Sequence, residues 1–287
     1  MSEDLVELSA AFSRSMRRLR ADFFASPAEI QRAETMARLA AAPFRGALAE
    51  AEPRSLEGPG ERAAFWINIY NACVSLSLVE LGIRENILLR ADFFIRTVIE
   101  LGGFGFSLDA IENGILRGNR RPRAWPLRPF GSGDPRRALC LAGPERRLCF
   151  ALNKGAVSSP SLRVFSAVRL EAELDEAERD FAAGHFVPDA AAKRLRCSRI
   201  YAWARKDIGA FWLGESAYRG WKTRYEDFVW RASGEASSEA SSEGAGQGPS
   251  ETPPEERGAG FAGAATGRGA PSGVAGGGHS GAPEEGP

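Results

Sequence analysis

The stretch from Glu61 to Leu81 limits the possible folds of this chain more than any other segment. It is helical in pattern and carries large apolar residues on nearly all sides, among them Phe65, Trp66 and Ile69. A helix without a polar face has to be covered on all sides by other parts of the chain. The sequence therefore predicts a central buried helix, with Gly82 at the position of a C-terminal cap.

Two asparagines, Asn68 and Asn71, interrupt this apolar helix. They are three residues apart and so lie on one face. Because a buried amide has to be hydrogen-bonded, we expect both side chains to bind the backbone of a neighbouring loop.

The N-terminal residues predict two further helices. Apolar residues recur at spacings of three and four from Leu5 to Phe23, which is typical of one stripe of a helix. This stripe either packs on the same domain or binds a partner helix, as in a short coiled coil. Residues 26–29 (SPAE) resemble a capping box that begins the next helix, and Pro43 is expected to end it.

The rest of the folded part alternates short strands, turns and helices. A Gly-Gly turn and a strand at 104–106 precede a helix capped by Ser107. Residues 117–137, rich in Arg, Pro and Gly, predict a long surface loop. The apolar run 148–152 predicts a buried strand, and helical patterns follow at 166–184 and 200–211. The predicted fold class is α+β, a helix-dominated single domain with a few short strands.

Composition changes at the C-terminal end. From Ala232 onward the chain has eight Glu, two Arg and only Phe261 and Val274 as large apolar residues. Such a segment buries too little apolar surface to offset the entropy of ordering it. We therefore expect a helical lead-in over 1–60 packed on the domain, a domain over 61–231, and a disordered acidic Gly/Ser/Pro-rich tail over 232–287, whose removal leaves stability unchanged.

Charge and motifs narrow the class of protein. The N-terminus lacks the basic and then apolar pattern of a secretory signal, and no apolar run approaches the ~20 residues that cross a bilayer. The four cysteines are widely spaced, without a CxxC pair or histidines at metal-ligand spacing. We expect a cytoplasmic protein with free thiols, no metal, no cofactor and no membrane association. The chain is neutral overall, so the acidic tail leaves the domain moderately basic.

Four segments together resemble the DUF547 family, whose activity is not established. In order, they are ERAAFWINIYNA (61–72), FSLDAIENGILRGNRRP (106–122), RLCFALNKGAVSSPSLRVFSA (147–167) and CSRIYAWARKDIG (197–209). The family's third segment typically reads His-Phe-Ala-Leu-Asn-Cys-Gly-Ala-x-Ser-Cys-Pro. This chain has Cys149, Lys154 and Ser159 at the His and the two Cys positions, while Asn153 fits the pattern. The resemblance is therefore to a divergent member.

The three replaced positions are those best suited to nucleophilic or acid–base chemistry. A cysteine nucleophile needs a base or cation that stabilises the thiolate. His185 is the one histidine ahead of the tail, and it is either a surface loop residue or a general base. Lys154, in a turn of small residues, is a solvated side chain, an anion ligand or a nucleophilic amine.

An arginine cluster in the 117–137 loop is a candidate anion site. Arg120, Arg121 and Arg123 lie near Trp125, a combination that binds phosphate or RNA by charge and stacking. The alternative is a solvated loop whose arginines pair with carboxylates of the domain. The candidate residues from the family segments are Asn68, Asn71, Cys149, Asn153, Lys154 and Ser159, and those for anion binding are Arg120, Arg121, Arg123 and Lys154.

Two functions are compatible with this sequence. One is a non-catalytic interaction or scaffold module with an unknown protein partner and weak polyanion binding. The other is a papain- or transglutaminase-like thiol hydrolase or transferase that uses a remaining cysteine. The placement of Cys149 relative to His185 distinguishes the two.

Overall fold

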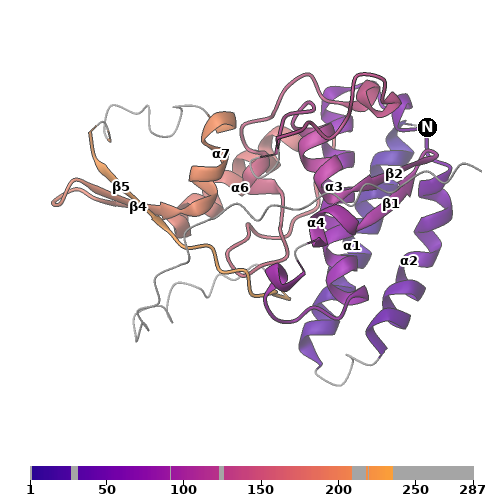
Figure 1. The fold of residues 1–287 in the computed structure, drawn as a ribbon, viewed down its shortest axis with the longest axis horizontal. Coiled ribbons are helices and arrows are strands. Elements are labelled where there is room, and N and C mark those ends of the chain that lie inside the picture. Colours follow the sequence, from indigo (N-terminus) through magenta and orange to yellow (C-terminus); the bar gives the residue numbers. More distant parts are fainter. Residues whose placement is uncertain are drawn as a thin grey trace, which may run out of the picture. The chain divides into compact units, whose positions relative to one another are not determined.

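The apolar helix predicted from the sequence is α3, Pro59–Glu80, and it forms the centre of the core (Figure 1). Every residue from 63 to 79 is buried. The carboxylate of Glu61 accepts the N–H of Gly58 at 3.2 Å and Pro59 occupies the first turn, so the helix begins with a cap. Gly82 ends it with a φ of +63°. The computed structural model describes residues 2–26, 32–90, 92–122, 126–208, 218 and 220–234.

The N-terminal helix α1, Ser2–Ala25, packs along α3. Its predicted stripe is confirmed, since Phe12, Met16, Leu19 and Phe23 are buried in the same core. The stripe therefore packs on its own domain.

The second helix, α2 (Ala33–Ala49), covers the core with Ala37, Ala41 and Leu48. The prediction that Pro43 ends this helix is wrong, because the helix runs six residues past it. Pro43 is exposed, so water can bind the backbone carbonyl that loses its partner there. Residues 27–31, and with them most of the predicted capping box, lie outside the described part of the chain.

A hairpin of β1 (Val98–Leu101) and β2 (Phe104–Ser107) follows, turned by Gly102 and Gly103, both with positive φ. The hydroxyl oxygen of Ser107 accepts the N–H of Ala110 at 3.1 Å, as predicted. The helix after it is a π-helix, η4, Ala110–Leu116. Gly114 is required in it, because a Cβ there would lie 2.5 Å from the ring of Phe130.

The apolar run at 148–152 is not a strand. Residues Leu148–Ala151 form one helical turn, α5. A run of five apolar residues does not distinguish a strand from a buried helical turn, and packing on α6 decides here. The remaining short helices are η2 (Pro53–Ser55), η3 (Ile87–Leu89), α4 (Phe93–Arg96) and η5 (Pro135–Leu139).

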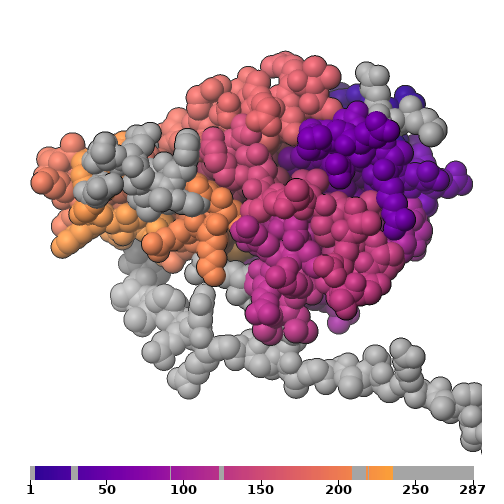
Figure 2. Space-filling model, turned by 90° about the horizontal axis from the view of Figure 1, so that it is seen from above, coloured from indigo at the N-terminus to yellow at the C-terminus, as the bar shows by residue number. Residues whose placement is uncertain are grey.

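The predicted C-terminal helices are α6, Leu170–His185, and α7, Arg199–Ile208. One stripe of α6 is buried, formed by Leu170, Leu174, Ala177 and Phe181, whereas Phe211 lies outside the described residues. A three-stranded sheet, not anticipated from the sequence, consists of β3 (Phe186–Asp189), β4 (Arg194–Ser198) and β5 (Lys222–Glu226). β4 pairs antiparallel with β3 and parallel with β5. This sheet lies at the opposite end of the domain from α1 and α2 (Figure 2).

The packed part of the chain extends past Arg231, where the tail was predicted to begin. Ala232 is buried and donates its N–H to the carbonyl of Glu85 at 2.7 Å. Ser233 donates to the carbonyl of Gly155 at 3.0 Å. Composition alone misplaced this boundary because Ala and Ser bind here through their backbones. Of the tail predicted over 232–287, residues 235–287 lie outside the described part. No helix among the described residues is long and apolar enough to span a bilayer.

Candidate functional site

The turn at residues 153–160, where the family places its two cysteines, is held by the side chain of Asn153. Its Oδ1 accepts the N–H of Gly155 at 2.8 Å, and its Nδ2 donates to the carbonyl of Pro160 at 2.6 Å. Gly155 has a φ of +83°, and a Cβ there would lie about 3 Å from Leu78 and Val74 of α3. Asn153 and Gly155 therefore determine the shape of the turn.

The two asparagines of α3 bind this region through paired hydrogen bonds, as predicted. Asn71 donates to the carbonyl of Ala151 at 3.0 Å and accepts the N–H of Asn153 at 3.0 Å. Asn68 donates to the carbonyl of Phe165 at 2.8 Å and accepts its N–H at 2.9 Å. The two side-chain amides thus hydrogen-bond to the backbone at each end of the 151–165 segment, as a neighbouring strand would do.

Ser159, at the second cysteine position, is also part of the backbone support. Its hydroxyl oxygen accepts the N–H groups of Lys154 at 3.2 Å and Ala156 at 3.0 Å. A hydroxyl with these two donors closes the turn on itself. This position holds the loop together and is 4 % exposed.

Arg20 of α1 reaches the same turn and is fully buried. Its guanidinium donates to Asn153 Oδ1 at 2.9 Å, to the carbonyl of Ser233 at 2.6 Å and to that of Gly155 at 3.3 Å. All three acceptors are uncharged, and burial lowers the pKa of Arg20 to about 10. Arg20 therefore joins the N-terminal helix, the family turn and the end of the domain. No pattern in the sequence distinguishes Arg20 from the other basic residues of this helix.

Lys154, at the first cysteine position, forms an ion pair with Glu112 of η4. Its Nζ lies 2.7 and 2.9 Å from the two carboxylate oxygens, and the Tyr70 hydroxyl donates to the same carboxylate at 3.1 Å. The ammonium lies 5.9 Å from the ring centroid of Phe94. This internal ion pair is none of the three roles that the sequence suggested for Lys154.

The charge of Glu112 depends on this contact. Burial by itself would raise the pKa of the carboxyl, but the ammonium of Lys154 and the Tyr70 hydroxyl together hold its pKa below the usual value. Burial, followed by the charge of Glu112, raises the pKa of Tyr70 well above its ordinary value. At neutral pH the group is therefore a carboxylate, an ammonium and a neutral phenol.

Cys149, at the histidine position, is half-buried on α5 and donates weakly to the carbonyl of Arg146 at 3.8 Å. Burial, and then the carboxylates of Glu178 and Asp207, raise the pKa of this thiol well above its ordinary value. Lys154 opposes this shift but does not reverse it. The environment therefore disfavours the thiolate that a nucleophile requires.

The general-base candidate is His185. It ends α6 with its ring against that of Phe181, at a centroid distance of 4.5 Å, and burial lowers its pKa. No hydrogen bond joins His185 to Cys149, both of which are described.

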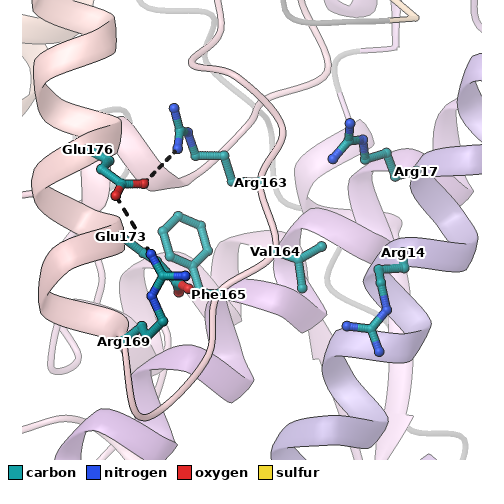
Figure 3. A pocket seen from close by; sticks show the side chains of 8 residues that line it. All are labelled: Arg14, Arg17, Arg163, Val164, Phe165, Arg169, Glu173 and Glu176. Atoms are coloured by element: carbon teal, nitrogen blue, oxygen red, sulfur yellow. Dashed lines mark ion pairs between the residues drawn. The ribbon is translucent and has the colours of Figure 1, made fainter.

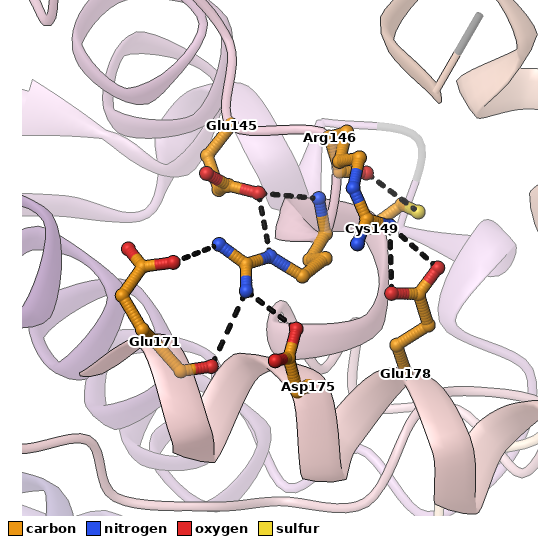
Figure 4. A network of polar contacts seen from close by, with 7 residues as sticks. Glu145, Arg146, Cys149, Glu171, Asp175 and Glu178 are labelled. Atoms are coloured by element: carbon orange, nitrogen blue, oxygen red, sulfur yellow. Dashed lines mark hydrogen bonds and ion pairs between the residues drawn. The ribbon is translucent and has the colours of Figure 1, made fainter. Parts of the chain in front are cut away.

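A second polar network surrounds α5 (Figure 4). Arg147 is nearly buried and binds Glu145 at 2.7 Å, Glu171 at 2.5 Å and Asp175 at 2.6 Å. Beside it, Arg146 binds both carboxylate oxygens of Glu178, at 2.7 and 2.6 Å. These bonds attach α5 to α6. The acidic spacing on α6 was the only signal in the sequence that pointed to them.

Part of the candidate anion cluster is paired within the domain. Arg120 and Arg117 both bind Asp207 of α7, at 2.8 and 2.7 Å. Arg121 is exposed, and Arg123 lies outside the described residues. Lys154 is distant in sequence from these arginines and forms its ion pair with Glu112. Of the loop arginines, Arg117 and Arg120 thus pair with a carboxylate of the domain. Among the described residues, no three His, Cys, Asp or Glu side chains are grouped so that they could hold a metal ion.

Comparison with known proteins identifies the family of this region. Residues 53–182 match a family model described as "Protein of unknown function, DUF547". The match includes the first three of the four segments singled out above, and residues 197–209 lie beyond it. No curated protein and no solved structure gave a significant match to the chain. Residues 53–182 of this chain therefore form a DUF547 domain.

Proposed function

We propose that this DUF547 domain is a non-catalytic binding module. The observation that carries the proposal is the use made of the three positions that resemble the family's His and two Cys. Lys154 forms an ion pair with Glu112, Ser159 binds two backbone N–H groups, and the thiol of Cys149 has a raised pKa. Lys154 and Ser159 thus hold other parts of the domain, and the environment of Cys149 disfavours the thiolate that a nucleophile requires. The partner is expected to be another protein.

A cytoplasmic location fits the same proposal. The four cysteines are all free thiols, and Cys73 and Cys197 are buried. Free cysteines persist in compartments kept reducing by glutathione and thioredoxin.

Thiol reactivity tests the proposal directly. We expect Cys149 to react with iodoacetamide more slowly than a model peptide thiol between pH 5 and 9, because only the thiolate reacts and burial disfavours it. Site-resolved mass spectrometry measures each cysteine separately, with a model peptide thiol in the same sample as the reference. An apparent pKa well below 7 for Cys149 would contradict the binding-module proposal and support the thiol hydrolase or transferase.

A structural role for Lys154 predicts a loss of stability when the lysine is removed. Lys154→Met should lower the free energy of unfolding by about 2 kcal/mol, because it leaves a carboxylate that is only 23 % exposed without its partner. The double variant E112Q/K154M should recover about 1 kcal/mol of that loss. Urea unfolding of Lys154→Met, Glu112→Gln and the double variant measures both values.

The pH dependence of this loss has a defined sign. Because the folded pKa of Glu112 is lowered, the ion pair stabilises the protein above the pKa of an unfolded Glu, about 4.3. The difference in the free energy of unfolding between wild type and Lys154→Met should therefore shrink as the pH falls below about 4.

A catalytic role for Lys154 predicts a different effect of Lys154→Met on stability. Replacing an active-site residue commonly leaves the free energy of unfolding unchanged or raises it. A neutral or stabilising Lys154→Met would contradict the structural role.

A further inference from the structure

A pocket of about 350 Å³ lies between α1 and the segment that leads into α6 (Figure 3). Four arginines line it: Arg14 and Arg17 from α1, Arg163 and Arg169 from the segment. Figure 3 shows the two α1 arginines projecting toward the stretch that carries Val164 and Phe165, with the other two arginines beyond it. None of these residues belongs to the family turn described above.

The two carboxylates in the pocket lining do not satisfy these guanidinium groups. Glu173 is bound to the N–H and the hydroxyl of Ser166, at 2.7 and 3.1 Å. Glu176 lies 3.7 Å from Arg163 and 3.8 Å from Arg169. Both distances are too long for a hydrogen bond. Glu176 therefore forms only long ion pairs with these two arginines and no hydrogen bond.

Carboxylates outside the lining satisfy only two of the four arginines. Glu7 binds Arg14, and Asp180 binds Arg163. Arg17 is exposed and pairs with no carboxylate among the described residues, and Arg169 has only the long contact to Glu176. Arg17 and Arg169, on opposite sides of the pocket, thus keep free donors.

The walls of the pocket are rigid. Phe165 is fully buried, and both of its backbone polar groups bind Asn68 of α3. α1 packs along the same helix. Two arginine-bearing elements are therefore held at a constant separation by α3, so a ligand that bridges them does not have to order the walls first.

We propose that this pocket binds a small anion with two or more phosphate or carboxylate groups. The planar guanidinium donates two parallel hydrogen bonds to either kind of oxyanion. The volume is within the range of small-molecule sites. Arg17 and Arg169 bind the anion directly, and Glu176 competes with it for Arg163 and Arg169. This inference is independent of the binding-module proposal, because it concerns other residues and does not depend on the absence of catalysis.

Calorimetric titration of the full chain with inorganic pyrophosphate and, separately, with citrate tests the pocket at constant ionic strength. We expect saturable binding of at least one probe. The variant R17A/R169A should weaken it at least about tenfold, which corresponds to the loss of one charged contact pair. R38A/R179A, which removes two exposed helix arginines outside the pocket, is the matched control and should bind like the wild type.

A third variant gives a change of the opposite sign. Glu176→Gln removes the competing carboxylate and should tighten binding by a few fold, an effect that a damaged fold does not produce. Binding of pyrophosphate alone identifies a phosphorylated ligand, and binding of citrate alone a carboxylate. The proposal is overturned if neither probe binds saturably, if the control variant loses as much affinity as R17A/R169A, or if Glu176→Gln weakens binding.

Discussion

Truncation after Arg231 is expected to lower the free energy of unfolding by about 3 kcal/mol. The cut removes Ala232 and Ser233, and with them the bonds to the carbonyls of Glu85 and Gly155. It also removes the carbonyl that accepts from the buried guanidinium of Arg20 at 2.6 Å. Each buried polar group left without a partner costs about 1–3 kcal/mol. Thermal melts should show a fall of about 6–12 °C for a domain of this size.

Truncation after Gly234 is the matched control. It keeps both residues and removes only a segment whose composition offers almost nothing to bury, so its melting temperature should equal that of the full chain. The two cuts differ by three residues. Equal melting temperatures for both would show that the contacts of Ala232 and Ser233 contribute no stability.

Asn71→Leu is expected to destabilise the protein by about 2–4 kcal/mol. Leucine is close in volume, but it leaves the N–H of Asn153 and the carbonyl of Ala151 buried and unpaired. The same reasoning applies to Asn68→Leu, which unpairs both backbone groups of Phe165. Midpoints of urea unfolding, at an unchanged slope with denaturant, measure the effect.

Asn86 provides the comparison for these substitutions. It is exposed and accepts one backbone N–H, from Leu88 at 2.9 Å. Asn86→Leu should therefore cost no more than about 1 kcal/mol. If Asn71→Leu were no worse than Asn86→Leu, the paired amide bonds would not be what holds the 151–153 backbone on α3.

The candidate site could be predicted only in part from the sequence. The hydrogen bonds of Asn68 and Asn71 follow from a general rule, because a polar amide on an apolar helix must find a partner. The pairing of Lys154 with Glu112 does not follow from any local pattern. The two residues are 42 positions apart, and either could equally have faced solvent.

The location of the proposed anion site also could not be predicted from local sequence patterns. Of the arginines clustered in sequence, Arg117 and Arg120 bind Asp207 of α7. The arginines that share a pocket are dispersed along the chain, with Arg17 and Arg169 separated by most of the domain. Clustering along the chain is therefore a poor guide to clustering in space for long, flexible cations.

What the sequence alone determined is the set of elements that a periodic pattern specifies over several turns. The helices α1 and α6 were predicted because three or more turns repeat an apolar spacing, and α3 because apolar residues cover nearly all of its sides. The tertiary structure decided the short and the distant features. The four-residue turn α5, the continuation of α2 through Pro43 and the short strands β3, β4 and β5 have too few residues to carry a period. Contacts such as that of Arg20 with Ser233, 213 positions away, exist only after the chain has folded. Local patterns specify backbone conformation, whereas the partner of a buried charge is selected by the packing of the whole domain.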